Sequence, residues 1–154
     1  MPPWIHIRVD LLHGGGIDLD PPPGRVFICG PEHSFGELAD AINDAFARWD
    51  RGHLHCFKLA DGRTIGFPDE EGFGFDLGWE DQEKLRPAEE LQAGEEFTFT
   101  FDLGDDWSHH CRVLAEETYL DATEAPPGPV PILGWGSIPD QYGRLTPDDF
   151  DVGE

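Results

Sequence analysis

The chain has 154 residues, enough for one ordinary domain and too few for two full ones. Its 32 acidic and 10 basic residues give a formal net charge of -22, which argues against direct binding to nucleic acid or to an anionic membrane. No window of about 20 apolar residues and no signal-peptide pattern occurs, and the three cysteines lack CxxC spacing. We therefore expect a single domain over 1–154 in the reducing cytoplasm, with aromatic side chains supplying much of its core.

Two strands and a helix are predicted in the first third of the chain. Residues 4–12 alternate with the period of a half-buried strand, and residues 25–29 resume an extended pattern after a loop rich in glycine and proline. Ser34 and Glu37 form a capping box just before apolar residues that recur at three- and four-residue steps as far as Trp49. This pattern predicts one principal amphipathic helix.

The next segment predicts a hairpin. Residues 53–59 have the pattern of a strand, and Asp61-Gly62 connects them to a second strand over 63–67. The opening order is therefore ββαββ, and one helix laid across a mixed sheet in this order indicates a β-grasp-like arrangement of the α+β class. A short helical stretch is expected around residues 81–91.

A long aromatic hairpin is predicted in the second half of the chain. Residues 97–103 alternate cleanly, and one face of this strand collects Phe97, Phe99, Phe101 and Leu103. A turn at 104–106 leads into a partner strand over 107–117. Beyond the hairpin the sequence loses its periodicity, so we expect an irregular tail over 121–154.

Histidine and aspartate residues gather in two places. At i and i+2 in the predicted strand, His53 and His55 place both imidazoles on one face, about 6.6 Å apart at the backbone. If the strands pack, a divalent metal ion could be held by His53, His55, Asp105 and His109. The alternative interpretation is structural: His55 and His109 are buried, and a backbone carbonyl or an aspartate satisfies each ring.

The same residues carry a family resemblance. The stretches HLHCF at 53–57 and FTFDLGDDWSHH at 99–110 resemble the plasmid pRiA4b Orf-3-like family, whose hallmark is Y-D-F-G-D-x-W-x-H. The hallmark falls on Phe101, Asp102, Leu103, Gly104, Asp105, Trp107 and His109, with Phe in place of Tyr and Leu in place of Phe. Near the C-terminus, the segment over 138–143 lacks the cysteine that family members usually carry there. The resemblance implies an α+β fold and a bacterial, plasmid- or transposon-associated origin, and it brings no established activity.

Three functions remain open. We favour a non-enzymatic accessory protein whose partner is another protein, which requires an exposed apolar patch. A metal-dependent hydrolase would use the candidate site residues and would need an open coordination position on the metal ion. An acidic mimic of DNA would need carboxylates spaced like phosphates along one face. Across these hypotheses the candidate site consists of His53, His55, Asp102, Asp105, Trp107 and His109.

Overall fold

A computed structural model describes residues 2–67 and 78–142. Within these ranges one sheet has the strand order β6-β5-β4-β7-β8-β1-β3-β9, with β2 paired to β1. The strands are β1 (Trp4–Gly14), β2 (Ile17–Asp18), β3 (Gly24–Cys29), β4 (His55–Leu59), β5 (Thr64–Gly66), β6 (Glu80–Asp81), β7 (Glu96–Phe101), β8 (Trp107–Thr118) and β9 (Val130–Trp135). The helices are α1 (Phe35–Ala45) and α2 (Pro87–Glu90). The β5–β6 pair is parallel and the others antiparallel, so the predicted mixed-sheet α+β fold is confirmed.

Apart from the additional two-residue strand β2, the predicted order ββαββ is present along the chain, but its two strand pairs are separated within the sheet. The β1–β3 pair and the β4–β5 pair are not neighbours, because the strands β7 and β8 lie between them. Long antiparallel ladders join β8 to β1 on one side and to β7 on the other. The aromatic hairpin therefore forms the middle of the sheet.

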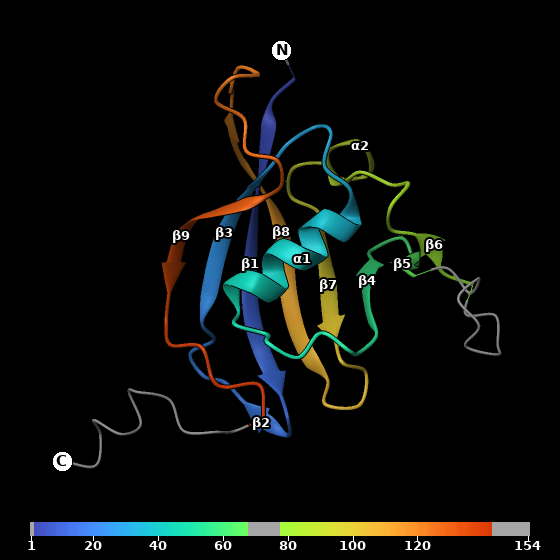
Figure 1. The fold of residues 1–154 in the computed structure, drawn as a ribbon, viewed down its shortest axis with the longest axis vertical. Coiled ribbons are helices and arrows are strands. Elements are labelled where there is room, and N and C mark those ends of the chain that lie inside the picture. The colour runs from blue at the N-terminus through green and yellow to red at the C-terminus, as the bar shows by residue number, and fades with distance from the viewer. Residues whose placement is uncertain (1, 68–77, 143–154) are drawn as a thin grey trace.

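Helix α1 lies across one face of the sheet (Figure 1, cyan). Both hydrogen bonds of the predicted capping box are present, between Ser34 and Glu37. The buried face of the helix includes Phe35, Leu38 and Ile42, which belong to the same core cluster as the inward side chains of the sheet. The helix was expected to reach Trp49 and ends at Ala45 instead. The chain leaves the helix because Ala47 adopts a left-handed backbone, with φ 57°.

The aromatic hairpin is confirmed. Phe99 lies opposite His109 and Phe101 lies opposite Trp107, and all four side chains are buried. Leu103 was expected to share this face, but it lies in the turn beyond β7 and is 47% exposed. The strand alternation that placed it inward ends at Phe101.

The tail expected to be irregular over 121–154 contains the strand β9, which pairs with β3 (Figure 1). Period-two alternation is missing because four successive residues of this edge strand, Pro131–Gly134, are all exposed. Residues 143–154 of that tail lie outside the described ranges. The helical stretch expected around 81–91 is reduced to Pro87–Glu90, with Pro87 in the first turn, where a missing N–H costs nothing.

Both edges of the sheet are protected against strand addition. On β9 a proline and a register shift interrupt the outer strand, and β6 is only two residues long and acidic. The three cysteines are free and buried. Among the described residues, neither helix is long and apolar enough to cross a membrane.

Candidate functional site

The turn of the aromatic hairpin is built by Asp102. This residue has a left-handed backbone, φ 61°, which aspartate tolerates better than most residues. One carboxylate oxygen accepts the N–H groups of Gly104 and Asp105, both at 3.2 Å. The Asp102 N–H donates to the Leu54 carbonyl at 2.8 Å, which joins the turn to the segment before β4. Asp102 therefore acts as the organiser of a hairpin corner.

His109 is a buried structural residue, in agreement with the structural interpretation of its sequence context. Its ring is inaccessible to solvent, and it lies between a carbonyl and a guanidinium. The carbonyl of Phe99, 2.9 Å from Nδ1, can only accept, so Nδ1 carries the proton. The guanidinium of Arg48, 3.0 Å from Nε2, can only donate, so Nε2 is the acceptor. With both nitrogens engaged, the ring has no lone pair left for a metal ion or for a substrate proton.

Burial and the neighbouring Arg48 lower the pKa of His109 to about 3, so the ring is neutral at ordinary pH. Arg48 is only 3% exposed and has no carboxylate partner within the described ranges. Its guanidinium donates to the Phe46 carbonyl at 3.0 Å and lies 4.9 Å from the centre of the Trp107 ring. Burial, followed by the charge of Arg51, lowers the pKa of Arg48 to about 9. A neutral imidazole and aromatic faces therefore take the place of a counter-ion.

Trp107 packs the aromatic hairpin against β1. Its ring covers Gly14 on β1, where a Cβ atom would overlap the indole. The glycine and the tryptophan thus allow close packing of the β1 and β8 backbones. Trp107, Asp102 and His109, three of the hallmark positions, all serve the hairpin and its packing.

His53 and His55 do not form the pair that their spacing predicted. His53 precedes the strand, which begins at His55, and the two rings have separate partners. His55 is buried and lies 2.7 Å from the Gln82 side-chain oxygen; burial is the main cause that lowers its pKa. The ring of His53 lies 2.6 Å from the Tyr142 hydroxyl and 3.5 Å from an Asp102 carboxylate oxygen.

Tyr142 completes a surface cluster that the sequence did not reveal. Its hydroxyl donates to Asp50 at 2.8 Å, so His53 Nε2 is the donor in the contact with the hydroxyl. The bond to Asp50 raises the pKa of Tyr142 to about 12. This cluster ties the segment after α1 to the end of the described chain.

The four predicted metal ligands are not brought together. Asp105 contributes its backbone to the turn, and its carbonyl accepts the Gly15 N–H at 2.7 Å. In residues 2–67 and 78–142, no group of three or more His, Cys, Asp or Glu side chains is arranged to hold a metal ion.

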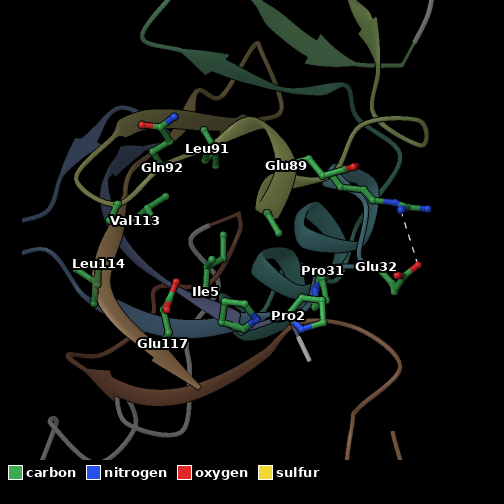
Figure 2. A pocket seen from close by; sticks show the side chains of 14 residues that line it. Pro2, Ile5, Pro31, Glu32, Glu89, Leu91, Gln92, Val113, Leu114 and Glu117 are labelled. Atoms are coloured by element: carbon green, nitrogen blue, oxygen red, sulfur yellow. Dashed lines mark ion pairs between the residues drawn. The ribbon is translucent and has the colours of Figure 1, made fainter. Parts of the chain in front are cut away.

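A cavity of about 550 Å³ opens at the end of the sheet where β1 begins. We call it the groove. Figure 2 shows Ile5 at its floor, with Leu91 and Val113 further along the wall. These three side chains belong to the hydrophobic core cluster.

The rim of the groove is mainly acidic. Figure 2 shows Glu32, Glu89 and Glu117 around it. Among the described residues that line the groove, Arg86 is the one cation. Arg86 lies 3.7 Å from the Glu32 carboxylate, so the cation is already paired. The carboxylates of Glu89 and Glu117 are exposed and can interact with a positively charged ligand. An apolar floor inside a negative rim fits a ligand that combines an apolar group with a positive charge.

The residues that line the groove come from several segments of the sequence. These segments are the start of β1, the loop after β3, the region of α2 and the end of β8. Sequence reasoning missed the groove for that reason, just as it missed Arg48, Gln82 and Tyr142.

Comparison with known proteins places this fold in a family. The family model described as "Plasmid pRiA4b ORF-3-like protein" matches residues 17–140. A crystal structure of a protein of unknown function, MM3350 from Methanosarcina mazei Go1, is similar with a TM-score of 0.65 and 21% identity. That similarity covers 87% of this chain and 71% of the other, and it shows a shared fold. Among curated proteins none matches the chain. Since the family model spans most of the sequence, including the aromatic hairpin, the chain belongs to the plasmid pRiA4b ORF-3-like family.

Proposed function

We propose that the chain is a protein-interaction module and that the groove binds a basic segment of its partner. An aliphatic side chain of that segment packs on Ile5, Leu91 and Val113. A lysine or arginine beside it meets Glu89 and Glu117 at the rim. This proposal assigns a binding site to the expected accessory protein. It also specifies the partner segment as one with an aliphatic residue beside a basic residue.

One observation carries the proposal: the hydrophobic core reaches a surface cavity inside an acidic rim. Ile5, Leu91 and Val113 are core residues and also line the groove. An apolar centre with a polar rim is the usual anatomy of a protein-binding site. The formal net charge of -22 attracts a basic partner over a longer range and repels an acidic one.

The test is a binding titration with a defined probe. The probe is a capped, fluorescein-labelled hexapeptide in which two leucines are flanked by lysines, and anisotropy reports its binding. We expect the wild-type chain to bind it and to reject the same peptide with glutamates in place of the lysines. Filling the groove with Ala93→Trp, at an exposed alanine of its wall, should abolish binding.

Neighbouring glutamates supply a matched control. Glu117→Lys and Glu116→Lys change the net charge equally at exposed positions, and only Glu117 lines the groove. We expect Glu117→Lys to weaken binding about fivefold to tenfold and Glu116→Lys to leave it nearly unchanged. Equal weakening by both variants would assign binding to the overall acidity of the chain, which is the behaviour of a DNA mimic, and would overturn the proposal.

A further inference from the structure

A second pocket adjoins the groove on the far side of Pro31. It has a volume of about 610 Å³, and we call it the side compartment. The side compartment and the groove share Pro2, Pro31 and Glu32 as lining residues. Its other walls are mostly small or apolar, with Leu120 and Pro126 among them. A ligand that leaves the groove across Pro31 therefore enters a second, weakly polar space.

One polar side chain in the side compartment is held ready as a donor. His33 lines it and is only 6% exposed. Its Nδ1 lies 2.8 Å from the Gly30 N–H, which can only donate, so Nδ1 is the acceptor. The proton of the neutral ring is then on Nε2. The edge-to-face contact with Trp4, at 4.8 Å between ring centres, fixes the orientation of the ring.

The Nε2–H group of His33 has no hydrogen-bond acceptor among the side chains and backbone groups of the described chain. The Nε2 atom is not among the fully buried polar atoms that lack a partner, so solvent in the side compartment reaches it, and a ligand that supplies an acceptor takes the place of that water. The acceptor must be uncharged, because Glu32 and Glu37 also line the side compartment and repel an anion. The main-chain carbonyl of a peptide is such an acceptor, and small side chains beside it fit the alanine and proline walls.

We infer that the groove and the side compartment together bind one extended segment of a partner protein, and that His33 Nε2–H donates to a main-chain carbonyl of that segment. This inference rests on the proposed function, since the basic part of the same segment occupies the groove. The segment carries its lysine or arginine at the groove and small uncharged residues beyond it. His33 thus serves as a specificity-determining residue for the part of the segment that passes Pro31.

The experiment extends the probe. Two longer peptides carry the same hexapeptide with six alternating alanine and proline residues added at one end or at the other. We expect one of them to bind at least fivefold more tightly than the hexapeptide. His33→Asn keeps an acceptor for Gly30 N–H and removes Nε2, so it should return that peptide to the affinity of the hexapeptide. Ala125, one of two exposed alanines that line the side compartment, gives a second variant, Ala125→Trp, which should do the same by filling the space.

The outcomes separate this inference from the proposed function. If the hexapeptide binds but neither extension improves affinity, the proposed function of the groove stands and the inference about the side compartment is wrong. If an extension helps equally in wild type and in His33→Asn, the assigned role of His33 is wrong. If neither variant changes hexapeptide binding while both remove the gain from the extension, the inference stands. Thermal melts of both variants confirm that each is folded before it is used.

Discussion

The contribution of His109 to the stability of the protein should fall between pH 7 and pH 5 because its ring is held neutral in the core. The folded chain keeps the pKa of this ring near 3, whereas an unfolded histidine titrates at about 6.5. Between these values the unfolded state binds one more proton than the folded state. The contribution of His109 to the free energy of unfolding therefore decreases as the pH falls through this window, and it is fully present only above about pH 6.5.

The size of the effect follows from the two pKa values. One proton taken up only by the unfolded chain lowers its free energy by about 1.4 kcal/mol for each pH unit well below 6.5. Allowing for the curvature near the unfolded pKa, the loss between pH 7 and pH 5 is roughly 2 kcal/mol. That is a substantial part of the 5–15 kcal/mol that roughly spans small domains.

The comparison variant is His109→Gln, which does not titrate. Its side-chain oxygen can still accept from Arg48, while the donor to the Phe99 carbonyl is lost. At pH 7 we expect this variant to be about 1–3 kcal/mol less stable than wild type, since a buried carbonyl loses its partner. At pH 5 the gap between the two proteins should be about 2 kcal/mol smaller than at pH 7. Other groups, including His55, titrate in both proteins and cancel in the difference.

Urea titrations followed by tryptophan fluorescence at pH 7, 6 and 5 measure both free energies of unfolding. A gap that stays constant across this range would refute the reasoning, because it would mean that the ring titrates alike in the folded and unfolded chains. A gap that widens towards pH 5 would mean that the folded chain stabilises a charged imidazolium. In either case the assignment of Nδ1 as donor and Nε2 as acceptor would have to be abandoned.

Three further predictions concern the hairpin and the core. Gly14→Ala should cost roughly 1–3 kcal/mol in a urea titration because its Cβ overlaps the Trp107 ring, whereas Gly128→Ala, with open space around it, should stay within about 0.5 kcal/mol of wild type. Asp102→Ala should lower stability by about 1–3 kcal/mol and Asp102→Asn by less than about 1 kcal/mol, since asparagine keeps the acceptor and tolerates the left-handed backbone; equal losses would reject the turn as the cause. A maleimide should label none of the three cysteines in the native protein and all three in urea, because all are buried and burial raises the pKa of each thiol; fast labelling of the native chain, followed by mass spectrometry, would contradict this.

Local signals in the sequence predicted most of the helices and strands. Contacts between residues that are far apart in the sequence could not be predicted from such signals. The capping box at Ser34 and the alternation through Phe99 depend on neighbours a few residues away, and both are present in the structure. The pairing of Arg48 with His109 joins residues 61 positions apart, and no periodicity reports such a contact. The histidine pair failed for a related reason: spacing places two residues on one face only if both belong to the strand, and His53 lies outside it.

Three positions of the hallmark are accounted for by the hairpin itself. Asp102 shapes the turn, Trp107 packs over β1, and His109 is the neutral partner of a buried arginine. Each of these tasks needs its residue type at its position, whatever the protein binds. A motif with this origin identifies the fold and is silent about the ligand.

The side chains at the rim of the groove, in contrast, have no role in the hairpin turn or in the Arg48–His109 pair. For this reason we propose the groove as the functional site. Its rim carboxylates, Glu89 and Glu117, are exposed and belong to segments whose backbones are fixed by other contacts. Replacing a rim carboxylate alters the charge that a partner meets without disturbing the Arg48–His109 pair or the hairpin turn. Under the proposed function, affinity for a basic segment can therefore change while the free energy of unfolding does not. Glu117→Lys provides the decisive comparison: a large loss of peptide binding at unchanged stability separates the binding surface from the hallmark, whereas His109→Gln should show the reverse.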